Sequence, residues 1–392
     1  MDPDLTRLDD YLAEAGLDGY LVDADGADAT QRYLSGFDAP DPFVTVYTPE
    51  TTALLVSTLE YGRARKESRA ETVSRLADYD YRSLADAHGS GEARARVVAA
   101  WLDDLGIESV AAPERFPLGP ADRLRDRDVA VAPESEDVVT KIRARKTDAE
   151  IDHIREAQRA NEAAMTAAEE LLRAAEIDRG EDVLRSGGEV LTSERVKEEI
   201  EVTLLRHGCA LDETIVSCGA DAADPHDRGS GPLRPDAPVI VDIFPRSKAT
   251  RYHADMTRTF VRGDPGDALR EWFDLTRTAL DAALDTIEAG VTGEAVHDAV
   301  CDVYEDAGLP TLRSDQATET GFIHSTGHGV GLDVHERPRL SPDGEELKPG
   351  HVVTVEPGLY DPEVGGVRIE DLVVVTEGGY ENLTEQPIEL RL

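Results

Sequence analysis

Four acidic residues end, or interrupt, stretches that otherwise have the composition of buried strands. This placement restricts the fold more than any other feature of the sequence. Asp242 ends the run Val-Ile-Val-Asp and Glu356 ends Val-Thr-Val-Glu, whereas Asp255 and Glu370 stand inside strand-like stretches. Acidic residues are depleted in strands, and a buried carboxylate needs a partner. One such acid could simply lead its strand into a turn, but four of them predict segments that meet around a shared counter-charge.

A glycine-rich histidine segment, residues 324–336, supplies a different kind of side chain. His324, His328 and His335 alternate there with glycines, which favours a loop that approaches a ligand closely. Each histidine alone is equally well interpreted as a hydrogen-bonded core residue. The zinc-protease motif His-Glu-x-x-His is absent, because Arg339 occupies the position of its second histidine.

Together these side chains predict a two-metal site. Four buried carboxylates would repel one another and raise their own pKa values, and two divalent cations would cancel their four charges. Arg368 lies two residues before Glu370, on the same strand face, where it could orient a metal-binding carboxylate. Oxygen-rich ligation with one imidazole favours Mn²⁺, with Co²⁺ or Zn²⁺ as alternatives. The predicted ligands are Asp242, Asp255, Glu356, Glu370 and one histidine of residues 324–336.

The charge balance bounds the partners. The 392 residues include 81 acidic and 41 basic side chains, for a formal net charge of -40. Such a surface repels nucleic acid and anionic lipid, so we expect neither nucleic acid nor a membrane as a partner. The acids are spread along the chain, which favours adaptation to high salt and predicts a halophilic source. Three separated cysteines argue against a disulfide framework, and neither a leader nor a spanning segment is evident, so we expect a cytoplasmic protein.

The chain length suggests two or three domains, and a change in pattern near residues 133–146 predicts one boundary. Residues 1–138 alternate strands and helices, which predicts a smaller α/β domain. Residues 139–392 begin with a capping box at Thr147 and Glu150, followed by a helix to about residue 175. They form an α+β domain whose predicted strands are 214–217, 239–244, 256–261, 352–355 and 367–375, and whose later predicted helices are 193–206, 267–287 and 293–307.

The polar motifs, taken in order, resemble those of the pita-bread metallopeptidases, the family of aminopeptidase P and prolidase. The resemblance rests on Val-Asp242, Asp255-x-Thr-Arg-Thr, His-x-x-Gly-His328-Gly-x-Gly, Glu356-Pro-Gly and Arg-x-Glu370, and it covers residues 212–372. It implies a C-terminal pita-bread fold, preceded by a creatinase/prolidase-type N-terminal domain. One departure is the spacing of Asp242 and Asp255, about two residues longer than the resemblance leads us to expect.

The resemblance also implies roles. Asp242, Asp255, His328, Glu356 and Glu370 would bind two metal ions, with Asp255 and Glu370 bridging them, and a hydroxide between the ions would attack the scissile carbonyl. Glu356 would shuttle the proton, while His226 and His335 would contact the substrate, His335 near the oxyanion and the departing proline nitrogen. The catalytic residues implied are thus Glu356, His226, His335 and Arg368. The family further implies a homodimer.

The expected function is hydrolysis of the peptide bond before proline, as an Xaa-Pro aminopeptidase or dipeptidase acting on proline-containing peptides. A methionine aminopeptidase is disfavoured, because about 140 residues precede the catalytic region. Another hydrolase or a lyase on the same fold remains an alternative. A binding protein that has lost catalysis is a third, although such proteins usually lose ligands, and all five ligands are present here.

Overall fold

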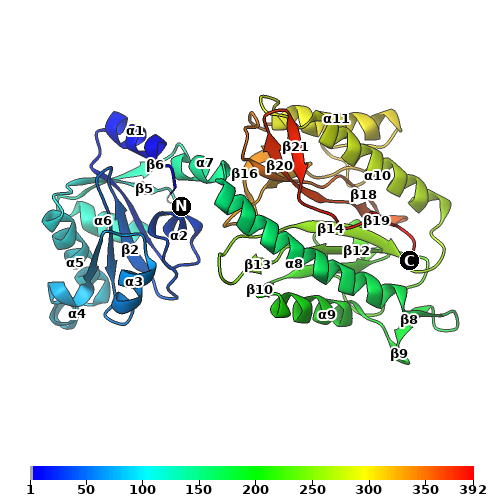
Figure 1. Cartoon of the computed structure of the whole chain (residues 1–392), viewed down its shortest axis with the longest axis horizontal. Helices are drawn as coiled ribbons and strands as arrows, with labels where there is room; N and C mark the ends of the chain where they lie inside the picture. The colour runs from blue at the N-terminus through cyan, green and yellow to red at the C-terminus, as the bar shows by residue number, and fades with distance from the viewer. Residues whose placement is uncertain (1–2) are drawn as a thin grey trace. The chain divides into compact units, whose positions relative to one another are not determined.

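A mixed six-stranded sheet organises the first of two units, which ends at Arg143 (Figure 1). The structure, a computed structural model, describes residues 3–392. The strand order is β4-β3-β2-β1-β5-β6, with β1 and β2 antiparallel and β1, β5 and β6 parallel. The strands are β1 (Gly19–Ala24), β2 (Phe43–Tyr47), β3 (Thr52–Val56), β4 (Thr72–Arg75), β5 (Ser109–Pro113) and β6 (Ala130–Glu134).

Short helices connect these strands and confirm the predicted α/β character. They are α1 (Thr6–Ala15), α2 (Ala29–Ser35), α3 (Tyr61–Glu67), η1 (Leu76–Tyr79), α4 (Tyr81–His88), α5 (Ser90–Asp104), α6 (Leu118–Arg125) and α7 (Val138–Ala144). The longest of these helices is α5, and its Val97, Val98 and Trp101 are buried in the core of this unit. The expected boundary after residue 138 falls at the start of α7, and the two units divide after Arg143.

Two antiparallel sheets form the second unit, Ala144–Leu392, and each packs against a pair of long helices (Figure 1). A three-stranded sheet of order β11-β12-β14 packs against α8 and α9. A five-stranded sheet of order β16-β15-β17-β20-β21 packs against α10 and α11. The helices are α8 (Asp148–Arg173), α9 (Ser193–Arg206), α10 (Asp267–Thr286) and α11 (Gly293–Asp306).

The strands of the first sheet are β11 (Thr214–Cys218), β12 (Pro238–Ile243) and β14 (Met256–Val261). Those of the second are β15 (Gly327–Gly329), β16 (Glu336–Leu340), β17 (Val352–Val355), β20 (Asp371–Thr376) and β21 (Gly379–Asn382). Smaller elements are β7 (Glu176–Asp178), β8 (Val183–Ser186), β9 (Glu189–Val190), β10 (Cys209–Ala210), η2 (Asp221–Ala223), β13 (Arg246–Ser247), β18 (Gly358–Asp361) and β19 (Gly365–Arg368). Within residues 3–392 we find no helix with the length and apolar character needed to cross a membrane.

Side-chain alternation decides which face of each strand carries polar groups. On β12, Val239, Val241 and Ile243 pack toward α8 and α9, so Asp242 must point to the opposite face. On β19 and just beyond it, Val367 and Ile369 join the core of α10 and α11, so the neighbouring side chains point away from that core. The apolar alternation therefore directs the acidic side chains into the space between the two sheets.

Two expectations about local structure are wrong. Residues 367–375 form two strands, because the chain leaves β19 after Arg368 and enters β20 at Asp371, so Glu370 stands between strands. The histidine segment is not entirely loop, because His328 lies in β15, whose residues pair with β16 and β17. A Cβ on Gly327 would meet the Thr354 carbonyl oxygen at 2.0 Å, so glycine here permits the close approach of β15 and β17. The helix at Thr147 is confirmed, with its capping box formed.

Candidate metal centre

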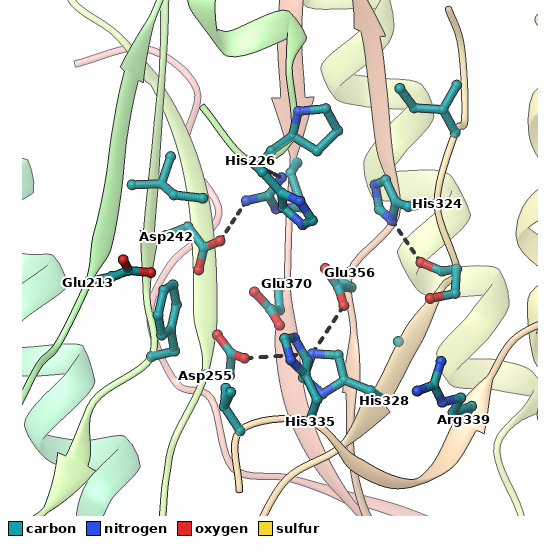
Figure 2. A pocket seen from close by; sticks show the side chains of 18 of the residues that line it. Glu213, His226, Asp242, Asp255, His324, His328, His335, Arg339, Glu356 and Glu370 are labelled. Carbon is teal, nitrogen blue, oxygen red and sulfur yellow. Dashed lines mark hydrogen bonds and ion pairs between the residues drawn. The ribbon is translucent and has the colours of Figure 1, made fainter. Parts of the chain in front are cut away.

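A cavity of about 840 Å³ lies within the second unit and is lined from both sheets. It brings together all eight side chains that the sequence singles out: Asp242, Asp255, His328, Glu356, Glu370, His226, His335 and Arg368. Figure 2 shows the carboxylates of Asp242 and Asp255 facing Glu370, Glu356 and the ring of His328 across the cavity. These side chains come from five separate segments of the chain.

The tightest cluster joins Asp255, His328 and Glu370, whose potential ligand atoms all lie within 4.8 Å of one another. His328 Nε2 lies 3.8 Å from Asp255 Oδ2 and 3.5 Å from Glu356 Oε1. Its Nδ1 lies 3.1 Å from the Gly329 carbonyl oxygen, to which it can donate. That hydrogen bond leaves Nε2 with its lone pair directed at the carboxylates, the arrangement that a metal-binding imidazole needs.

The carboxylates repel one another where they lie. Burial, followed by the charge of Glu370, raises the pKa of Asp255 well above its usual value. Burial, followed by the charge of Glu356, does the same to the pKa of Glu370. Burial is also the main cause that raises the pKa of Glu356, to about 8. Burial lowers the pKa of His328 to about 3, and the neighbouring His335 adds to this effect. The imidazole is therefore neutral, and the Arg368 guanidinium offsets only part of the negative charge of the carboxylates.

Unpartnered atoms indicate what would satisfy this cluster. Asp242 Oδ1 and Glu370 Oε1 are buried, and among residues 3–392 neither has a hydrogen-bond donor. Buried acceptors without partners are rare in folded proteins, and each costs free energy. Divalent cations would supply both the missing partners and the missing positive charge, and carboxylate oxygens with one imidazole are suitable ligands for them. The residues present therefore fit divalent metal ions.

Arg368 holds the cluster from behind. Its Nη2 donates to Asp242 Oδ2 at 2.6 Å, and its Nε donates to Thr257 Oγ1 at 3.2 Å. Thr257 Oγ1 in turn donates to Glu370 Oε2 at 2.7 Å. The arginine thus contacts Asp242 directly and reaches Glu370 through a threonine hydroxyl. Both contacts fix one oxygen of a carboxylate and leave its other oxygen without a hydrogen bond.

A further chain of hydrogen bonds continues from the arginine to His324. Arg368 Nη1 donates to the Tyr360 hydroxyl at 2.9 Å, and that hydroxyl lies 3.0 Å from His324 Nε2. His324 Nδ1 lies 2.7 Å from the Ser325 carbonyl oxygen. Burial lowers the pKa of His324 to about 3, so this neutral ring donates to Ser325 and accepts from Tyr360. Its role here is to hold Tyr360 against the arginine.

The sequence did not predict the supporting roles of three residues, Thr257, Thr354 and Tyr360. Thr257 and Thr354 each lie two positions from a predicted ligand, hence on the same strand face, and this spacing was a usable signal. Thr354 Oγ1 accepts from the His328 backbone N–H at 3.0 Å and lies 3.3 Å from Glu356 Oε1. No comparable spacing in the sequence indicates Tyr360, because its contact with Arg368 depends on how β18 pairs with β19.

His226, His335 and Arg339 also line the cavity. The ring of His335 lies against that of His328, with centroids 4.3 Å apart. Burial, then the charge of Arg339, lowers the pKa of His335. In Figure 2 Arg339 lies beyond His328, whereas Glu213 lies at the other end, beyond Asp242. The cavity therefore extends on both sides of the carboxylates, with a cation at one end.

The sequence profile described as "Metallopeptidase family M24" matches residues 152–377, and the "Creatinase/Prolidase N-terminal domain" matches residues 5–144. The chain belongs to metallopeptidase family M24. Its M24 region contains all five clustered side chains, and the predicted fold, a creatinase-type N-terminal domain followed by a pita-bread domain, is confirmed. As a member of this family it is a metallopeptidase, and divalent metal ions are its cofactors.

Relatives and solved structures extend over nearly the whole length of the M24 chain. It is 27% identical to the Xaa-Pro dipeptidase of Pyrococcus horikoshii over 399 residues, covering 100% of this chain and 99% of the relative. The Xaa-Pro dipeptidase from Bacillus anthracis superposes with a TM-score of 0.82 at 27% identity, covering 99% of each chain. The X-Pro aminopeptidase from Thermotoga maritima superposes with a TM-score of 0.79 at 25% identity, covering 96% of this chain and 98% of that one.

Proposed function

We propose that this metallopeptidase hydrolyses the peptide bond before proline in Xaa-Pro dipeptides. The similarity to Xaa-Pro dipeptidases and to an X-Pro aminopeptidase supports cleavage before proline. The observation that favours dipeptides is Arg339. This side chain lines the cavity and is exposed to it, and within residues 3–392 its guanidinium has no ion-pair partner. A dipeptide places a carboxylate one residue beyond the scissile bond, where an arginine is well suited to bind it.

In this proposal Asp242, Asp255, His328, Glu356 and Glu370 would hold two divalent ions, with Asp255 and Glu370 contributing to both. Two divalent ions match the four carboxylate charges, and the oxygen-rich set favours Mn²⁺. When bound, such ions polarise the scissile carbonyl and lower the pKa of bound water to about 7. Positive charge in the cluster also keeps Glu356 ionised, because its attraction for the carboxylate lowers the pKa that burial raises.

The protein's own groups carry the proton and the orientation. Glu356 accepts the proton of the attacking water and returns it to the departing proline nitrogen. His335 is a neutral donor because its pKa is lowered, and it hydrogen-bonds the oxygen on which negative charge develops. Arg368 keeps Asp242 in place. His226 binds the substrate from the loop after η2. The homodimer and the cytoplasmic location stay predictions.

A substrate panel tests the proposal. Wild-type protein loaded with Mn²⁺ in molar KCl is offered Ala-Pro, the amide Ala-Pro-NH₂, Ala-Pro-Ala and Met-Ala. We expect Ala-Pro to be hydrolysed best, with kcat/KM on the amide lower by roughly 10²-fold, because a charge-assisted contact is lost. Arg339→Met should remove most of that preference, whereas Arg391→Met, a change at a remote surface arginine, should not.

The panel has clear alternative outcomes. Equal hydrolysis of Ala-Pro and its amide would refute the dipeptide assignment and leave cleavage before proline intact. Preferred cleavage of Met-Ala would indicate a methionine aminopeptidase. Protein that retains its metals but cleaves none of these peptides would refute the proposed function.

A further inference from the structure

A buried ion pair lies at the start of β16, the strand that His335 immediately precedes. Lys146 Nζ lies 3.1 Å from Glu336 Oε2, and both side chains are almost fully buried, with 1% and 2% exposure. The second carboxylate oxygen, Oε1, accepts from the Asp333 backbone N–H at 3.0 Å. Breaking a buried pair by removing one partner leaves an uncompensated charge, so this contact strongly restricts both segments.

The lysine is held independently of the cavity. Its backbone N–H donates to the Gly350 carbonyl at 2.8 Å, and the next residue, Thr147, caps α8. Gly350 immediately precedes the stretch that leads into β17. Lys146 is therefore a fixed point between a long helix and the central strand of the five-stranded sheet.

Glycine at position 331 makes room for the carboxylate. A Cβ at Gly331 would lie 2.5 Å from Glu336 Oε2, closer than real Cβ atoms approach. The Gly331 carbonyl also accepts from the His253 backbone N–H at 2.8 Å, which ties this loop to the segment that leads to Asp255. Residues 330–336 are thus held at two points, by the backbone of His253 and by the side chain of Lys146.

The pair acts on the cavity through the chain itself. Glu336, the first residue of β16, is buried at the cavity wall, whereas His335 and Arg339, which also line the cavity, are exposed. His335 immediately precedes Glu336, so a contact that fixes the Glu336 side chain also restricts the backbone that carries the His335 ring. We propose that the Lys146–Glu336 ion pair is a positioning device that holds His335 in the orientation used for catalysis. This inference rests on the proposed function only for the activity readout.

The test compares the pair variant in two backgrounds. Lys146→Met combined with Glu336→Gln removes both charges together and so avoids leaving one buried alone. We expect kcat on Ala-Pro to fall by roughly 10–100-fold, with bound metal unchanged, because a displaced catalytic group loses alignment. In a His335→Ala background the same pair variant should change kcat by less than about twofold, because it acts through the missing ring. An equal loss in both backgrounds would overturn the proposal.

A second variant moves the carboxylate without changing a charge. Gly331→Ala should also lower kcat, and should do so only when His335 is present. Gly378→Ala is the matched control, because a Cβ at Gly378 meets no atom within 4 Å. A Gly331→Ala protein with wild-type kcat would contradict the proposal.

A readout independent of activity keeps this inference separate from the proposed function. Histidine-selective NMR of the protein loaded with diamagnetic Zn²⁺, with the His335 ring signal assigned by its absence in His335→Ala, should show that signal shifted in Gly331→Ala. The His226 ring signal should stay in place. An unmoved His335 signal would overturn the positioning role even if the wild-type protein proved inactive on every Xaa-Pro peptide.

Discussion

The crowded carboxylates predict an unusual pH dependence for the metal-free protein, and Glu356→Gln isolates it. The pKa of Glu356 is raised by burial to about 8, from a usual value of 4.5. The folded state therefore binds this proton more tightly than the unfolded state does. The contribution of this group to the free energy of unfolding is fully present below pH 4.5, and it is lost as the pH rises through 8. At 1.36 kcal/mol per pKa unit, the full loss is on the order of 5 kcal/mol, of which about 3 kcal/mol falls between pH 5.5 and 8.

The assay is urea unfolding in molar KCl with a chelator, at several values between pH 5.5 and 8.5. Trp272 lies in α10 of the second unit and Trp101 in the first, so a Trp101→Phe background makes fluorescence report the second unit alone. We expect the wild-type unfolding free energy to fall by at least about 3 kcal/mol more across this range than that of Glu356→Gln. The difference should be larger still because Glu356 also raises the pKa of Glu370.

Two further measurements make the test specific. The exposed Glu319 provides a matched control, and Glu319→Gln should show a curve parallel to that of wild type. Mn²⁺ at a fixed concentration, 100 times its Kd at pH 8, should add about 2.7 kcal/mol for each ion bound at that pH and less at lower pH, which flattens the pH trend because metal binds the ionised carboxylates. Wild-type and Glu356→Gln curves that run parallel in the absence of metal would refute the electrostatic account of this site.

Three further predictions concern metals, histidines and salt. Asp255→Ala or Glu370→Ala should lower the metal content from about two ions per chain toward none, because each carboxylate is proposed to bind both ions; elemental analysis showing two retained ions would refute the shared ligation. His335→Ala should lower kcat on Ala-Pro by roughly 10²–10⁴-fold with metal content unchanged, whereas His226→Ala should mainly raise KM, so steady-state kinetics showing the reverse pattern would exchange their roles. The unfolding midpoint should rise steeply from dilute buffer to molar KCl, given the net charge of -40, and an unchanged midpoint would contradict the expected adaptation to salt.

Much of the fold, and the choice of candidate residues, followed from local patterns. The period-two alternation of β12 and β17 sends apolar side chains toward the helices, so the acids that end these strands point the other way. The capping box at Thr147 defined the start of α8, and it too is a local pattern, since Thr147 and Glu150 lie within one turn. Such patterns depend only on neighbouring residues, which a single sequence displays completely.

The contacts that give the site its geometry depend on segments far apart in the chain. Arg368 lies two residues before Glu370 in the sequence. The carboxylate to which it donates a hydrogen bond directly, however, is that of Asp242, 126 positions away. Lys146 and Glu336 are 190 positions apart, and nothing local marks either as half of a buried pair. In the sequence, Arg339 showed only that the zinc-protease motif is absent. Its place in the cavity became apparent from its position in β16. Alternation determines the strand face from which a side chain projects. Only the packing of the two sheets decides which residues it contacts there, because the separation of the sheets depends on the core residues that pack against them.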